Sequence, residues 1–114
     1  MDDLTISTVH TALRGLSQRQ KVISNNIANV ETPGYTAQKV SFEDSLRAAV
    51  RQGAPQYANL SVTPVETPAN INGNNVQLDD ETMSLVDTGL QYQLMVEAMN
   101  SKFGLLRTAM GRGA

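Results

Sequence analysis

The chain has 114 residues, enough for one domain at most, and its 40% hydrophobic content includes 4% aromatic residues and no tryptophan. Nine basic against eleven acidic residues leave a net charge of −2, so composition gives no electrostatic case for binding nucleic acid or an anionic membrane. The absence of cysteine excludes disulfides and thiolate metal sites.

Residues 3–29 are predicted to form one long helix. Apolar residues recur at alternating steps of three and four, the spacing of a heptad seam, with Gln20 as one polar interruption. At 1.5 Å per residue the helix is about 40 Å long. A helix of that length in so short a chain needs a partner along its whole length. The seam residues are Ile6, Val9, Leu13, Leu16, Ile23 and Ile27.

Asparagines crowd the last turns of this helix, and a strong turn signal follows them. Each asparagine is a poorer helix former than alanine by roughly 0.7 kcal/mol, so three together indicate side chains that bond to the following turn or to another chain. In the turn, Pro33 fixes φ at the first corner, and Gly34 accepts the positive φ that a type II turn needs at the second. These residues are Asn25, Asn26, Asn29, Thr32, Pro33, Gly34 and Tyr35.

Residues 30–77 are predicted to contain this turn, one short helix and a largely irregular loop. Ser41 and Asp44 resemble a capping box at the start of the short helix, which is expected to end near Gly53. From Gly53 onward the helical period is lost, and the segment is predicted to be an extended loop that a neighbour orders. Residues 60–62 are a candidate for a short strand within it.

Residues 78–111 are predicted to hold the second long helix, with Asp79 as its N-cap. A second apolar stripe runs beside its seam, and apolar residues on more than one face imply contact with more than one partner helix. Gly89 and Gly104 each cost about 1 kcal/mol in a helix interior and are expected to permit close helix approach. The seam residues are Leu85, Tyr92, Val96, Met99, Phe103 and Leu106, and the stripe residues are Met83, Val86, Leu90, Leu94, Met95 and Leu105.

Candidate catalytic residues are few. His10 is the only histidine, and its helical neighbour is Arg14 rather than an acid, so a solvated or packed histidine is the favoured interpretation. The acidic run 79–81 is more simply a helix N-terminus than a metal site. No nucleophile, base and acid can be assembled around one histidine and no cysteine, and the glycines show no phosphate-binding spacing. The sequence therefore predicts a protein that is not an enzyme and has no cofactor or metal.

Two stretches together resemble the flagellar rod and hook axial proteins. The N-terminal helix of that family ends in an Asn-Asn-hydrophobic-Ala-Asn string before a Thr-Pro-Gly-Tyr or Thr-Thr-Gly-Phe turn, and residues 25–35 are similar to that signature. With Val-Ser-Phe at 40–42, the stretch is most similar to the proximal rod members. Residues 75–81, followed by Tyr92-Gln93 and Asn100, are similar to the C-terminal helix of the same family.

The resemblance covers about residues 5–50 and 74–111. It implies an all-α subunit with a single domain, residues 1–114, whose two terminal helices pair as a coiled-coil-like hairpin and line the inside of a tubular shaft. It implies a structural role in the bacterial flagellar basal body, next to the membrane ring and export gate. Implied partners are copies of itself, other rod proteins and the membrane-ring and export-gate junction proteins, without nucleic acid or a small-molecule substrate.

The resemblance also implies export by the flagellar type III apparatus without a cleaved signal peptide. Asp2 and Asp3 stand where a cleavable signal would carry basic residues, in agreement with that expectation. Two alternatives remain open. One is the neighbouring rod protein FlgC, which is disfavoured because its glycine-rich insertion is absent after Tyr35. The other is a free-standing helical-hairpin adaptor or export chaperone, which the paired amphipathic helices also fit.

Overall fold

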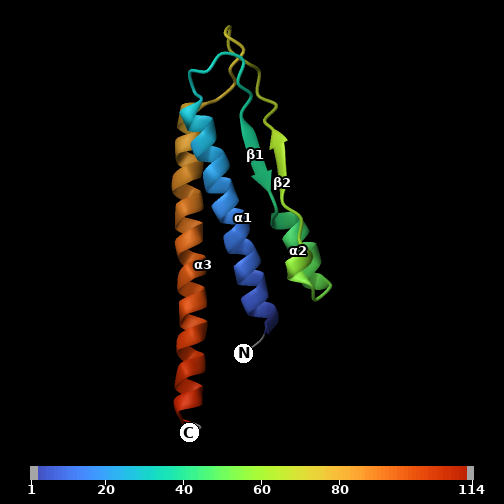
Figure 1. The fold of residues 1–114 in the computed structure, drawn as a ribbon, viewed down its shortest axis with the longest axis vertical. Helices are drawn as coiled ribbons and strands as arrows, with labels where there is room; N and C mark the ends of the chain where they lie inside the picture. The colour runs from blue at the N-terminus through green and yellow to red at the C-terminus, as the bar shows by residue number, and fades with distance from the viewer. Residues whose placement is uncertain (1–2, 113–114) are drawn as a thin grey trace.

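The computed structural model describes residues 3–112, apart from the side chains of Asp3, Leu106 and Arg112. Two long antiparallel helices, α1 (Asp3–Ala28) and α3 (Leu78–Arg112), lie side by side, and the remaining elements lie on the side of α1 away from α3 (Figure 1). The molecule measures 67 × 26 × 14 Å, so it is a flat, elongated slab with α1 in the middle. Among the described residues, no helix combines the length and apolar character needed to cross a membrane.

The two helices differ in length, with 35 residues in α3 against 26 in α1. The C-terminal turns of α3 therefore extend past the N-terminal end of α1 (Figure 1). The long N- and C-terminal helices that the heptad pattern predicts are both present.

The expectation of an all-α fold is correct only in part, because the middle segment contains a small antiparallel sheet. Strand β1 (Gln38–Ser41) pairs with β2 (Ser61–Pro64), and Val40 stands opposite Val62. Pro64 lies at the end of its strand, where a residue without an N–H group is tolerated. The side chain of Val40 is buried, and β1 packs along α1. The sheet forms because β1 gains burial against α1 and β2 then satisfies its backbone.

Helix α2 (Glu43–Arg51) follows β1 directly, and the predicted capping box at its start is wrong. Phe42 occupies the N-cap position and makes no side-chain capping bond. Ser41 belongs to the sheet, where it pairs with Ser61, so its backbone is fixed by strand geometry rather than by the helix. A single 3₁₀ turn, η1 (Pro55–Tyr57), connects α2 to β2.

The start of α3 also differs from the prediction. The helix begins at Leu78, and the amide of Glu81 donates to the carbonyl oxygen of Gln77 over 3.0 Å. Asp79 is therefore a residue of the first turn and not the N-cap. Asp79, Asp80 and Glu81 all lie in that turn, where negative side chains interact favourably with the positive end of the helix dipole.

The apolar core lies midway along α1, where β1, α2 and α3 all approach it. Its buried residues and the partly buried ones packed on them are Leu16, Val22, Val40 and Phe42 with Ala12, Leu46, Tyr92 and Met95. Met95 is thus part of the core and not of the exposed stripe that the sequence predicts. The reason is geometric, because each helical residue turns by about 100° from the last, which carries Met95 from the outward direction of Leu94 toward α1.

Within the single chain, Gly89 and Gly104 of α3 mark no close helix approach, and an approach there by a helix of another copy stays a prediction. A Cβ atom at Gly89 would lie 3.8 Å from Nε2 of Gln20, an ordinary contact, and one at Gly104 would meet no described atom within 4 Å. The close approach occurs instead at Gly15 of α1, where a Cβ atom would stand 2.6 Å from Cδ1 of Phe42.

Candidate functional site

Asn26 is the centre of a polar network at the end where α1 finishes and α3 begins. Its side chain is 0% exposed. Its Nδ2 donates to the carbonyl oxygen of Gln38 (2.8 Å) and to Oε2 of Glu81 (3.1 Å). Its Oδ1 accepts from the amide of Gln38 (3.0 Å) and from the hydroxyl of Tyr35 (3.1 Å). Both N–H groups and both acceptor sites of this side-chain amide are therefore used. The amide joins α1, the turn, β1 and α3.

The turn after α1 has the geometry that the sequence predicts. The amide of Tyr35 donates to the carbonyl oxygen of Thr32 over 3.2 Å, and Gly34 has a φ of +74°, the positive value that a type II turn requires. Asn29 stabilises its start, because Nδ2 donates to the carbonyl oxygen of Asn25 (2.8 Å) and Oδ1 accepts from the hydroxyl of Thr32 (3.0 Å). Asn25 contributes its backbone carbonyl, and its side chain is exposed, as is that of Pro33.

Asn74 ties this turn to the segment that leads into α3. Its side chain is buried, and Nδ2 donates to the carbonyl oxygens of Asn29 and Thr32, each over 2.8 Å. Its Oδ1 accepts from the amide of Val76 over 2.7 Å. The same two carbonyl oxygens also accept from the backbone amides of Thr32 and Tyr35, so Asn74 adds a second hydrogen bond to each and ties the turn after α1 to a segment 45 residues away from Asn29.

Asn75 connects the segment before α3 to the residues that flank the small sheet. Its Nδ2 donates to the carbonyl oxygens of Val65 and Thr67, each over 3.0 Å, and its Oδ1 accepts from the amide of Ala37 over 2.6 Å. The Asn75 amide itself donates to the carbonyl oxygen of Tyr35 over 3.3 Å. Asn26, Asn29, Asn74 and Asn75 together form what we call the asparagine network.

Sequence reasoning missed Asn74 and Asn75 as site residues. The signal was available, because four asparagines occur within residues 70–75, a density comparable to that at 25–29. Their setting among proline and glycine favours a loop, and loop asparagines are ordinarily exposed. In the described part of the chain, every buried side-chain nitrogen and oxygen atom has a hydrogen-bond partner.

A second polar group surrounds Phe42 nearer the N-terminal end of α1. The guanidinium of Arg19 forms two hydrogen bonds to the Glu43 carboxylate, 2.6 and 2.7 Å long, and a third to the carbonyl oxygen of Val40 over 2.9 Å. It also lies 4.9 Å from the centroid of the Phe42 ring, within cation–π range. The hydrogen bonds from Arg19 hold the pKa of Glu43 below its ordinary value of 4.5. Arg19 therefore ties the start of α2 to α1.

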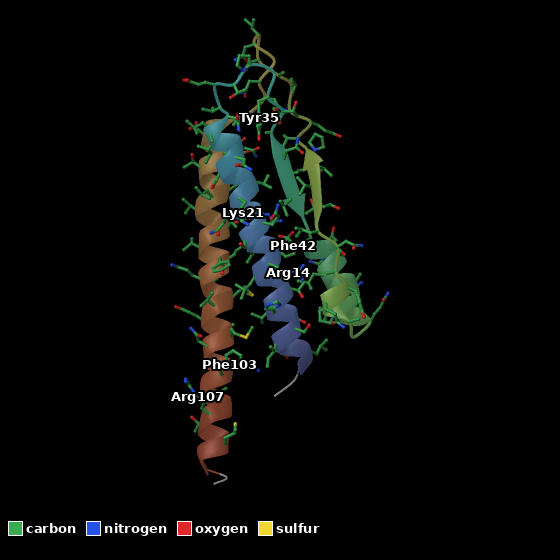
Figure 2. All side chains as sticks on the ribbon, viewed as in Figure 1. Arg14, Lys21, Tyr35, Phe42, Phe103 and Arg107 are labelled. Atoms are coloured by element: carbon green, nitrogen blue, oxygen red, sulfur yellow. The ribbon has the colours of Figure 1, made fainter. Side chains whose placement is uncertain are left out.

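The residues of the predicted assembly seam are largely buried or half-buried within the single chain. Leu16 and Ile23 are buried, and the remaining α1 members are half-buried: Ile6, Val9, Leu13 and Ile27. On α3, Leu85, Tyr92, Val96 and Met99 are half-buried. Phe103 is more exposed, nearer the end that passes α1 (Figure 2), and the side chain of Leu106 lies outside the described residues. A role for the seam in contacts between copies stays a prediction.

The second apolar stripe of α3 lies on the opposite side of the helix from the seam. Its members are 57–72% exposed, and we call them the outer stripe: Met83, Val86, Leu90, Leu94 and Leu105. At about 100° per residue, Met83, Leu90 and Leu94 project roughly opposite to Leu85 and Tyr92. No described element of this chain covers the outer stripe, since α3 forms one edge of the molecule (Figure 1).

The described residues offer no group of three or more acidic, histidine or cysteine side chains arranged to hold a metal ion. His10 is exposed on α1. It lines a shallow surface groove of about 480 Å³ that runs along α1 and is bounded by residues 58–60 and Tyr92. The arrangement supports packing and polar cross-linking of the chain.

Comparison with known proteins agrees with this geometry. A family model described as "Flagella basal body rod protein" matches residues 6–36, the stretch that includes most of α1 and the turn. The "Flagellar basal body rod protein FlgB" of Bacillus subtilis (strain 168) is 35% identical over 122 aligned residues, which cover 96% of this chain and 95% of that protein.

Proteins with the same description from other bacteria are also similar to this chain. The one from Borreliella burgdorferi is 33% identical, with 82% of this chain and 86% of that protein covered. The one from Escherichia coli (strain K12) is 28% identical, with 88% of each covered. The chain belongs to the FlgB family of flagellar basal body rod proteins.

Proposed function

We infer that this chain is a structural subunit of the flagellar basal-body rod, in its proximal part, and that it has no chemistry of its own. The family relationship spans nearly the full length of both proteins, which supports a shared role over the whole chain. It also disfavours FlgC, because the three relatives described above carry the FlgB description.

The main structural support for this function is that α3 has apolar side chains on two opposite faces. One face packs on α1, while the outer stripe is left exposed along about three helical turns between Met83 and Leu94. Soluble monomers rarely expose a continuous apolar patch without a partner for it. A subunit whose long helices pack on other subunits needs such a face, and an enzyme or a ligand carrier does not.

In the rod, the terminal helices of each copy pack side by side with those of its neighbours and form the inner layer of a tubular shaft. The partners are other copies, other rod proteins and the proteins at the junction with the membrane ring and export gate. The subunit reaches this position through the flagellar type III export apparatus without a cleaved signal peptide. In that setting the asparagine network holds the middle segment at a fixed angle to the helix pair.

The rival function is a free-standing helical-hairpin adaptor or export chaperone. Such a protein is a stable helical dimer by itself, so its helicity melts cooperatively at micromolar concentration with no further assembly. A rod subunit instead continues to associate as its concentration rises. Sedimentation velocity over a concentration series, with circular dichroism on the same samples, separates the two.

The decisive test is genetic. Cells of the source bacterium that lack the gene are expected to be non-motile and to yield basal bodies without a rod, and a plasmid copy restores both. Loss of swimming with intact rods would point to the adaptor, and normal swimming of the deletion strain would exclude the rod function.

A further inference from the structure

We propose that the groove on α1 of one copy receives the outer stripe of α3 from a second copy, and that complementary charge fixes this pairing. The inference rests on the proposed function. It specifies which two faces of the subunit contact each other between neighbouring copies. It is motivated by two surfaces of the same chain that both carry apolar side chains and are complementary in charge but point in different directions.

The groove is lined by apolar and polar side chains, and two exposed basic residues are among them. Leu13, Phe42 and Tyr92 are among its apolar lining residues, and no acidic residue lines it. Arg14 and Lys21 lie on α1 (Figure 2), both are exposed, and neither forms an ion pair with any described residue. The two charges are therefore available to a partner.

The outer stripe is apolar at its centre and acidic along one edge. Asp80 and Asp87 are exposed beside Met83 and Leu90, and neither forms an ion pair with any described residue. The Oδ2 atom of Asp87 accepts a hydrogen bond from the neutral amide of Gln91 over 2.8 Å, which leaves its charge uncompensated. No basic residue occurs in the sequence between Met83 and Leu94.

The spacing of the two sets of charges is the same. Arg14 and Lys21 are seven residues apart on one helix, and Asp80 and Asp87 are seven residues apart on another. Seven residues are close to two helical turns, so each pair lies on one face with its members about 10 Å apart. When the second copy's α3 lies along the groove, both charge pairs can form together while the stripe covers the apolar lining residues.

A chain cannot place its own outer stripe in its own groove, because the stripe faces away from α1 of that chain. The contact is therefore heterologous: each copy offers a groove to one neighbour and a stripe to another. Heterologous contacts generate rings or open helical assemblies rather than closed dimers. Ion pairs at the edge of such an interface determine its register and the choice of partner, and salt weakens them.

The first experiment reverses the charges on each surface separately. One full-length variant carries Arg14→Glu with Lys21→Glu, and the other carries Asp80→Lys with Asp87→Lys. Each variant alone brings like charges together, so we expect its self-association at low salt to weaken by about tenfold or more relative to the parent. An equimolar mixture restores opposite charges at every contact and is expected to associate as the parent does. Sedimentation velocity measures all three.

The matched control is Lys39→Glu with Arg47→Glu, which makes the same change in net charge at exposed positions outside the groove. It is expected to associate like the parent, and circular dichroism checks that every variant folds. A parent that does not associate at low salt, single variants that associate normally, or a mixture that stays dissociated would overturn the proposal.

The second experiment uses the absence of native cysteine. A chain with Ser17→Cys in the groove and Leu90→Cys on the stripe is expressed in deletion cells, and isolated basal bodies are oxidised. We expect a ladder of disulfide-linked copies, whereas Leu90→Cys alone gives none. Motile cells whose rods give no ladder would refute the pairing and leave the rod function standing. A deletion strain that still swims would instead refute the rod function.

Discussion

The ring of Phe42 fills the space that a side chain at Gly15 would need. A Cβ atom on Gly15 would stand 2.6 Å from Cδ1 and 2.7 Å from Cε1 and Cγ of that ring. The Arg19 guanidinium lies 4.9 Å from the ring centroid, and Phe42 is almost fully buried. The ring is therefore held between helix backbone and guanidinium, and the first residue of α2 is positioned by it.

Gly15→Ala is expected to destabilise the folded chain, although alanine is the better helix former. The gain in helix propensity is about 1 kcal/mol, and overpacking a buried ring costs about 1–3 kcal/mol. Overpacking determines the direction of the change because three ring atoms would lie 2.6–2.7 Å from the new Cβ atom, so the ring must move from its place under Arg19. Gly89→Ala is the control, since its Cβ makes an ordinary contact, and it should raise the urea midpoint. Equal effects of the two changes would contradict this account.

Asn26→Asp is expected to lower the free energy of unfolding by about 2–4 kcal/mol. The carboxylate keeps the shape of the amide but cannot donate to Gln38, and it places a negative charge beside Oε2 of Glu81, 3.1 Å from the present Nδ2. Urea denaturation measures the loss. Asn25→Asp, at an exposed position, should stay within about 0.5 kcal/mol of the parent. Adding Glu81→Gln to Asn26→Asp should recover part of the loss, and a purely additive result would rule out the charge explanation.

The Arg19–Glu43 pair is expected to make stability depend on pH in the acidic range. Its hydrogen bonds hold the pKa of Glu43 below 4.5 in the folded chain, so their stabilisation is present above that pH and is lost as the pH falls through the lowered pKa. The Glu43 side chain is 49% exposed, so the effect is below about 1 kcal/mol. Glu43→Gln should remove this part of the pH dependence, as followed by urea midpoints above and below pH 4.5. A parent-like pH profile in the variant would exclude the pair as its source.

Gly34→Val is expected to strain the turn without any steric clash. Its φ is +74°, and a Cβ there would meet no described atom within 4 Å, so the cost of about 1–3 kcal/mol comes from the backbone alone. Because Asn74 holds this turn, the strain should already lower the stability of the isolated subunit. Cells carrying Gly34→Val should be non-motile. Gly34→Asn should be milder, since asparagine tolerates positive φ. Normal swimming with valine would show that the turn geometry is incidental.

The two long helices and the turn could be predicted because each depends on local rules. The period of three and four is continuous in the sequence, and α1 ends one residue before its expected limit at 29. The Pro33-Gly34 step specifies its turn through backbone preferences alone. These features need no knowledge of distant residues.

The buried asparagines and the role of Arg19 could not be predicted in the same way, and the sheet could be predicted only in part. The candidate strand at 60–62 overlaps β2, but all four residues of β2 are exposed, so no buried face marks its pairing with β1. Asn74 is buried only because the carbonyl groups of Asn29 and Thr32 are brought to it by the pairing of α1 with α3. In the sequence nothing distinguishes Arg19 from the other basic residues of α1. Its role depends on β1, which places Glu43 beside it.

The thinness of the slab should make the association of copies sensitive to temperature. With an extent of only 14 Å in its shortest direction, the subunit has a small interior, and much of its apolar surface on α3 is left for contacts between copies. Such contacts weaken on cooling, because hydrophobic association is driven by entropy near room temperature. The fold of the single chain rests in addition on the asparagine network. Chilling should therefore separate the copies before it unfolds them, and light scattering should show smaller particles in the cold that regain their size on rewarming.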